Sequence, residues 1–340
     1  MAFQSGFPAD DEALYTDWIG WLVGQGGFVQ SEASFTHGAN SIRIDKSFSA
    51  NYSPGSTVTW TQQPLTHSAS GHKILVGRIS NSGGMLEGCF SMQTYSGTTV
   101  TGTRPSGQPL GNAENVYVED GISCYVSPNP SRYWMFSNGT QSHCVVEYEN
   151  GAFTMMSTGS ITPYGTGWQP GVYCTATLWA RHYPYITLDY TNNFHAKPFG
   201  VYTNYTGDTA NPAYSGQMTF TDAATAVRTV SMGVTYSSVD IATIRCSISK
   251  EASIYTLIER AFNGYNSRNI LIPVELMYAG VGTSDWVPMG RIDNCAFTNL
   301  DHLDEPGIVL TDWFVFPLWS RATTASHGNS GNFALAFSTV

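Results

Sequence analysis

The sequence predicts a mainly β protein: antiparallel sheets in a sandwich-like arrangement, with two short α-helices. The 340 residues include 34 glycines and 13% aromatic residues, a composition typical of strands joined by many turns. Short runs with alternating apolar residues recur along the chain, as at Ile122, Cys124 and Val126, and this period of two indicates half-buried strands. Only two stretches have helical spacing instead, one near the N-terminus and one before the C-terminal strands.

The first helix is predicted over residues 11–24. Four large apolar residues fall on one face: Leu14, Trp18, Trp21 and Leu22. Asp10, Asp11 and Glu12 stand at the start, where acids complement the helix dipole, and the glycines after position 23 end the helix. These acids could instead bind a metal ion, but capping is favoured because consecutive helical residues do not point at one ion.

The central strands are predicted from residues 121–164. Strands at 122–126, 133–136 and 142–148 should form an antiparallel meander. Pro128 and Pro130 favour a turn after the first strand, and Asn138-Gly139 favours a tight turn after the second.

The remaining elements follow the same reasoning. Strands are expected at 41–48, 56–62, 73–79, 86–92, within 217–248, and at 270–279, 286–297, 307–318 and 332–338. The second helix is expected at 251–262, with Ile254, Leu257, Ile258 and Ala261 on one face. This pattern suggests a β-rich domain at 1–245 and a helix-plus-strand module at 246–340, with a single integrated domain as the alternative.

Residues 164–214 read as loops that are dense in tyrosine, tryptophan and proline. Large amphipathic rings are enriched at protein interfaces, so these loops and the first helix are candidate assembly contacts. The residues singled out are Trp18, Trp21, Trp168, Trp179, Tyr183, Tyr185, Tyr202 and Tyr205. The alternative is that the rings cover the flank of their own sheet.

Charge and cysteine usage narrow the classes of function. Charged residues make up 12% of the chain and the net charge is −10 with 15 basic residues, which argues against sequence-independent nucleic-acid binding. The sequence contains no apolar run long enough for a membrane span and no secretory signal pattern. Six cysteines without a Cys-x-x-Cys pair predict buried free thiols in a reducing cytoplasm, with a disulfide between Cys124 and Cys144 as a minor alternative.

No motif predicts an enzyme, a cofactor or a metal site. The sequence lacks the spacing of zinc-protease, phosphate-loop, dinucleotide and serine-hydrolase motifs. His67 and His72 are expected at the surface. Asp301–Glu305 is expected as an exposed turn, with cation binding through oxygen ligands as the alternative. A pair of carboxylates that cleaves sugars remains open, because such a pair needs only proximity in space.

Several short segments together resemble one family. They are Arg132–Phe136, Asn138, Val145-Val146, Gly159 and Pro163-Tyr164 in the centre, a helix ending in Gly-Gly-Phe at the N-terminus, and Ile270–Leu276, Gly290–Ile292, Trp313–Pro317 and Asn332–Ala336 near the C-terminus. In order and spacing they are similar to a family of tailed-bacteriophage virion proteins. The aromatic loops between Tyr173 and Tyr214 have no counterpart in this resemblance.

The resemblance implies a structural protein of the virion, in the tail or neck, made in the cytoplasm of the bacterial host. Its partners would be copies of itself and other virion proteins, with no specific nucleic acid and no membrane. Capsid decoration is one alternative. The other is a carbohydrate-binding or carbohydrate-cleaving β protein, such as a receptor-binding component, in which the 164–214 rings stack on a glycan.

Overall fold

The computed structural model describes residues 1–30, 35–37, 58–81, 89–95, 122–125, 129–148, 152–165, 168, 171–177, 198–200, 213–221, 227–234, 243–246, 262–263, 268–269, 271–280, 286–299, 308–310, 312–317 and 333–340. Within these residues the chain forms one α-helix and three sheets. Every strand pairing is antiparallel apart from one parallel pair, β14 with β15. The mainly β, antiparallel prediction is therefore confirmed for this part of the chain.

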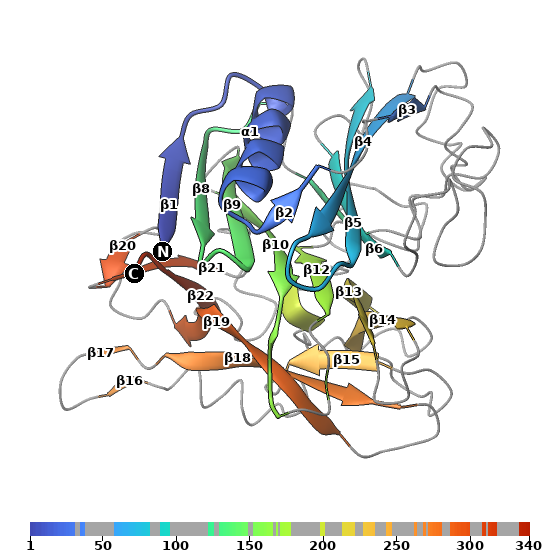
Figure 1. The fold of residues 1–340 in the computed structure, drawn as a ribbon. Coiled ribbons are helices and arrows are strands. Elements are labelled where there is room, and N and C mark those ends of the chain that lie inside the picture. Colours follow the sequence, from blue (N-terminus) through green and yellow to red (C-terminus); the bar gives the residue numbers. More distant parts are fainter. Residues whose placement is uncertain are drawn as a thin grey trace.

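A large sheet of fourteen strands dominates the fold (Figure 1). Its order is β1 (Ala2–Gly6), β8 (Arg132–Ser137), β9 (Gln141–Tyr148), β10 (Ala152–Ser160), β12 (Val172–Ala176), β13 (Ala213–Thr221), β14 (Val227–Val234), β15 (Thr243–Cys246), β18 (Ile272–Ala279), β19 (Val287–Asn299), β22 (Phe333–Ser338), β21 (Trp313–Pro317) and β20 (Ile308–Leu310), while β11 (Thr162–Pro163) pairs with β19. The sheet bends back on itself, so that its second half, from β18 onward, faces β8, β9, β10 and β12 across a shared core.

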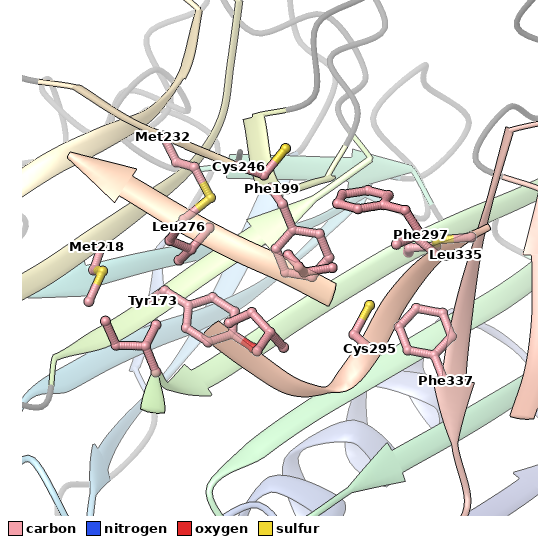
Figure 2. Packing of buried hydrophobic residues seen from close by; sticks show 14 of the residues in the cluster. Tyr173, Phe199, Met218, Met232, Cys246, Leu276, Cys295, Phe297, Leu335 and Phe337 are labelled. Carbon is pink, nitrogen blue, oxygen red and sulfur yellow. The ribbon is translucent and has the colours of Figure 1, made fainter. Parts of the chain in front are cut away.

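Aromatic rings fill the space between the two halves of the large sheet. The ring of Phe136 on β8 stacks on Phe337 of β22 with centroids 5.3 Å apart, and Trp134 lies 5.0 Å from Phe316 of β21. Figure 2 shows rings and sulfur-containing side chains of this core pointing into one interior. Burial of such rings is the largest apolar contribution that single side chains make to folding.

A second core covers the opposite face of β8, β9, β10 and β12. It is closed by α1 (Asp11–Gly24) and by a six-stranded sheet. The strands of that sheet are β2 (Phe28–Val29), β3 (Phe35–His37), β4 (Val58–His67), β5 (Lys73–Asn81), β6 (Cys89–Tyr95) and β7 (Ile122–Tyr125). A separate pair, β16 (Phe262–Asn263) with β17 (Arg268–Asn269), completes the sheets of the described residues.

The N-terminal helix is confirmed, together with the role of its acids. The Asp10 side chain caps the helix by accepting a 2.8 Å hydrogen bond from the Ala13 amide. Asp11 accepts two hydrogen bonds from the Arg78 guanidinium on β5, at 2.6 and 3.2 Å, and Glu12 lies 3.4 Å from the same guanidinium. The acids therefore fix the start of α1 and attach it to the small sheet.

Two predictions for the centre of the chain are wrong. The strand at 122–126 was expected in a meander with the next two strands, but β7 pairs with β6 in the small sheet, and the meander is instead β8, β9 and β10. The stretch 164–214 was expected to be loops, but Val172–Ala176 forms the fully buried strand β12. Five buried residues in a row show no alternation, because both faces of this strand are covered.

The C-terminal elements agree more closely with expectation. Strands β18, β19 and β22 lie where they were predicted, and the run at 307–318 is divided into β20 and β21. The second helix is not found: residues 251–261 lie outside the described residues, and Phe262, its last predicted residue, belongs to β16. The strand predicted at 41–48 also lies outside them.

The shared aromatic core spans the predicted boundary at residues 245 and 246. Trp134 and Phe136 come from one side of that boundary, and Phe316 and Phe337 from the other. Residues from both sides of the predicted boundary therefore lie in one apolar core.

Four thiols are predicted to react only when the protein unfolds. Cys144, Cys174, Cys246 and Cys295 are buried thiols outside any disulfide, so a Cys124–Cys144 disulfide is absent. Burial raises the pKa of the thiols of Cys144, Cys174 and Cys295, and the thiolate is the reactive form. Alkylation with iodoacetamide followed by peptide mapping should label all four in denaturant and none in native buffer. Rapid native labelling at any of them would contradict this core.

Candidate functional site

The predicted contact residues on α1 lie inside the protein rather than on its surface. Trp18 is fully buried and Trp21 is 6% exposed, both packed in the core beneath the helix. Trp168 is half-buried, and its ring packs edge-on against Phe220 and Tyr278 at 5.7 and 5.6 Å. The other predicted contacts lie outside the described residues: Trp179, Tyr183, Tyr185, Tyr202 and Tyr205.

Two exposed phenylalanine rings lie on and beside β1. Phe3 is 41% exposed and Phe7 is 79% exposed. Phe3 packs against Phe136 and stacks on Phe314 at 4.9 Å. The guanidinium of Arg132 lies over the ring of Phe7 and also over the ring of Trp134. Phe3 and Phe7 therefore share the face of β1 that continues into the aromatic core.

The opposite face of β1 is tied to α1. The Gln4 amide donates to the Tyr133 hydroxyl at 2.8 Å, and that hydroxyl donates to Asp17 of the helix at 3.0 Å. The ring of Tyr133 also covers Gly6, where an added Cβ would lie 2.8 Å from it. β1 is thus held on both faces and along β8, while its outer edge is the end of the large sheet.

The chain crosses between the two halves of the large sheet after Gly159. That glycine has a φ of 144°, and an added Cβ would lie 2.3 Å from the carbonyl oxygen of Thr140, so only glycine fits there. Beyond it, Pro163 pairs with Gly290 in β19, and the Tyr164 amide donates to the Met289 carbonyl at 2.8 Å. Two segments of the family resemblance, Gly159–Tyr164 and Gly290–Ile292, therefore meet at this crossover.

A polar group lies at the surface of the crossover. The Tyr164 hydroxyl donates to Glu275 at 2.8 Å, and the Asp293 carboxylate accepts hydrogen bonds from Arg291 and Thr162. Partial burial and the neighbouring Glu275 carboxylate raise the pKa of Tyr164 to about 12. These groups satisfy one another and hold β11 against β18 and β19.

A chain of hydrogen bonds crosses the aromatic core from β12 to β19. The His143 ring lies 2.7 Å from Asn294 Oδ1 through Nε2 and 2.8 Å from Ser157 Oγ through Nδ1. Ser157 Oγ is in turn 3.0 Å from the Tyr173 hydroxyl. Because Asn294 Oδ1 can only accept, Nε2 carries the proton, Ser157 donates to Nδ1, and Tyr173 donates to Ser157.

Burial keeps this histidine neutral. His143 is fully buried, and desolvation lowers its pKa to about 4, an effect that the Asn294 hydrogen bond partly offsets. Burial also raises the pKa of Tyr173, so its hydroxyl keeps its proton. A neutral network without charged members suits a dry core, because an unpaired charge there would be costly.

The Ser157–His143 contact has the distance of a nucleophile and its base, but the pair is enclosed. Ser157 is 3% exposed and His143 is fully buried, with the ring of Phe337 4.9 Å from the imidazole. A catalytic serine must meet both its base and a substrate. These hydrogen bonds therefore link the two halves of the large sheet inside the core.

The other histidines differ from expectation. His67 was expected at the surface but is fully buried; its ring contacts the Thr140 carbonyl at 3.2 Å, and burial lowers its pKa. His72 is half-buried, and burial likewise lowers its pKa. Among the described residues, no group of three or more metal-ligating side chains is gathered, and Asp301–Glu305 lies outside them.

No protein-family model matches the chain, and no curated protein is significantly similar to it in sequence. In the part of the chain that the structure describes, no helix has the length and apolar character needed to cross a bilayer.

Sequence reasoning missed the most exposed rings and the buried network. Phe3 and Phe7 stand in an uncharged stretch with the spacing of one strand face, a signal that could have identified an exposed edge. The residues of the His143 network come from four strands, and no spacing along the sequence connects them.

Replacing His143 by glutamine should reduce the loss of stability in mild acid. In the unfolded chain the imidazole has a pKa of about 6.5, whereas in the folded chain it is about 4. Below pH 6.5 the unfolded state binds a proton that the folded state does not, so stability falls as the pH drops. This group should account for a loss of about 2 kcal/mol between pH 7 and pH 5. Urea unfolding of wild type and His143→Gln at the two pH values measures this loss of unfolding free energy. The control variant His72→Gln should reduce the loss by a smaller amount. Equal pH dependence of wild type and His143→Gln would disprove this role of His143.

Replacing Gly159 by alanine should destabilise the protein far more than the same change at Gly165. Both glycines have positive φ, but the Cβ at Gly165 would meet nothing within 4 Å, so Gly165→Ala should cost about 1 kcal/mol for its backbone conformation alone. At Gly159 the obstacle is backbone, and a cost of about 3 kcal/mol or more is expected. Thermal and urea unfolding of the two variants tests this, and similar losses would refute the crossover geometry.

Proposed function

We propose that the protein is a structural component of a tailed-bacteriophage virion, in the tail or neck, that acts through symmetric contacts between protein subunits. Its partners are copies of itself and other virion proteins, and its place of synthesis is the bacterial host cytoplasm. The role is structural rather than catalytic, and neither a cofactor nor a nucleic-acid site forms part of the proposal.

The observation that carries this proposal is the way the resembling segments meet in space. The ring of Phe136, from the central segment, lies 5.7 and 6.3 Å from Phe314 and Phe316 of the C-terminal segment. Pro163 pairs with Gly290, which belongs to another of these segments. The segments that carry the resemblance therefore build one core and one crossover.

Composition and layering also support a structural role. The chain has few charged residues for its size, and the layer β8, β9, β10 and β12 is enclosed by two cores. Layers packed on both faces transmit strain rather than absorb it, because protein interiors are dense and little compressible. Such rigidity is what a subunit under mechanical load in a particle requires.

A reconstruction of the intact virion should contain this chain in several symmetry-related copies at the tail or neck. Closed symmetric assembly is expected because one gene product then covers a symmetric surface with one kind of contact. Mass spectrometry of purified virions should first detect the chain in them. Its absence from them, or a single copy without symmetric contacts, would refute the proposal, and density on the capsid surface would favour decoration instead.

The carbohydrate alternative gives a different result with the isolated protein. Specific binding on a glycan array that Trp168→Ala abolishes, without loss of thermal stability, would favour a glycan-binding role. Hydrolysis of a polysaccharide or peptidoglycan panel that is lost on replacing one carboxylate would show an enzyme. The structural proposal expects neither signal.

A further inference from the structure

Among the described residues, no strand pairs with the outer edge of β1, which is therefore an open strand edge in this part of the chain. β1 stands at the end of the large sheet, and its three central residues, Phe3, Gln4 and Ser5, are all exposed. It pairs with β8 over five consecutive residues without a register shift. Natural proteins commonly block such edges with a lysine, a proline or a bulge, because unpaired backbone groups bind other strands. The strand Ala2–Gly6 contains none of these devices.

The two phenylalanines of this edge are placed symmetrically about Ser5. Phe3 and Phe7 flank Ser5 at equal distances, and both rings lie on the face of β1 that borders Trp134 and Phe136. In an antiparallel pair of identical strands, a two-fold axis at Ser5 places Phe3 of each strand opposite Phe7 of the other. Cross-strand aromatic pairs stabilise a sheet beyond their burial.

Charge also favours contact between copies at this edge. The chain carries a net charge of −10, yet residues 1–9 contain no charged side chain. Two copies repel one another over most of their surfaces, so an uncharged strand is where they approach at least cost. The exposed Phe7, at 79%, then loses its contact with water.

We propose that two copies of this chain join through antiparallel pairing of their β1 strands, centred on Ser5. The pairing extends the large sheets of both copies into one continuous sheet, and the two phenylalanines of each copy form cross-strand pairs with those of the other. The contact is self-complementary, as a two-fold interface must be. It rests on the proposed function only in that it names one contact by which copies assemble.

Ser5→Cys should trap this pair as a disulfide. Residues directly opposite across an antiparallel pair have Cβ atoms about 5 Å apart, within reach of a disulfide after small adjustment. Mild oxidation should give a covalent dimer on non-reducing gels, and the mass spectrum should contain the N-terminal peptide joined to its own copy through the introduced cysteine. Val227→Cys is the matched control, because Val227 is 46% exposed but lies on β14 inside the sheet order. A Ser5→Cys protein that stays monomeric, or that cross-links no more than the control, overturns the proposal.

Ser5→Lys tests the same contact without a covalent bond. Two lysines would then stand opposite each other at the axis, and like charges in that position oppose pairing. Sedimentation should show the dimer dissociation constant raised by about tenfold or more, with unchanged circular dichroism and melting temperature, while Val227→Lys leaves it unaltered. The backbone amides of β1 that point away from β8 should exchange slowly in wild type and quickly in Ser5→Lys, while those that pair with β8 stay protected in both. A wild-type protein that is monomeric with fast-exchanging β1 amides refutes the proposal.

The outcomes separate this inference from the proposed function. If the chain is absent from virions but the Ser5→Cys protein forms the covalent dimer, the virion role is wrong and the β1 contact stands. If the chain is present in virions and β1 there pairs with a different protein or faces solvent, the virion role stands and the β1 contact is wrong.

Discussion

Burial of β8, β9, β10 and β12 on both faces is the constraint on which the rest of the structure depends. In β8, Trp134 points into the aromatic core and Met135 into the core beneath α1, and both are almost completely buried. A layer of this kind is stable only if something apolar covers each face. The small sheet and α1 cover one face, and the folded-back half of the large sheet covers the other. The long path of the chain from β12 through β22 serves to bring that second cover into place.

This constraint explains which elements could be predicted from the sequence. The helix at Asp11–Gly24 could be predicted because its cap, its apolar face and its final glycine are all local signals. Strand β12 was not, because Val172–Ala176 has no alternation when both of its sides are buried. The strand that pairs with β7 could not be predicted either. The prolines that follow β7 indicate a turn, but they do not indicate which sheet each flanking strand joins. Of the candidate contacts, Trp18 and Trp21 were chosen by residue type, and the same apolar character that suits an interface placed them in the core.

The polar network within the aromatic core fixes the register of the two halves. Four strands each contribute one member of this network: Tyr173, Ser157, His143 and Asn294. Each hydrogen bond joins one residue of a strand to one residue of another strand. A shift of one residue in any of these strands would turn its polar group to the other face and leave the remaining groups unpaired in a dry interior. The network therefore requires the same alignment that the apolar faces of these strands also require.

The position of β22 has a consequence for how the chain folds as it is made. β22 lies between β19 and β21, although both of these precede it in the sequence. Until residues 333–338 have left the ribosome, β19 and β21 lack the strand that joins them, and the aromatic core lacks Leu335 and Phe337. Until β22 is made, the nascent chain therefore carries open strand edges and uncovered rings, the condition in which chains aggregate or engage chaperones. A ribosome that stalls between β21 and β22 leaves a chain in which this core cannot close.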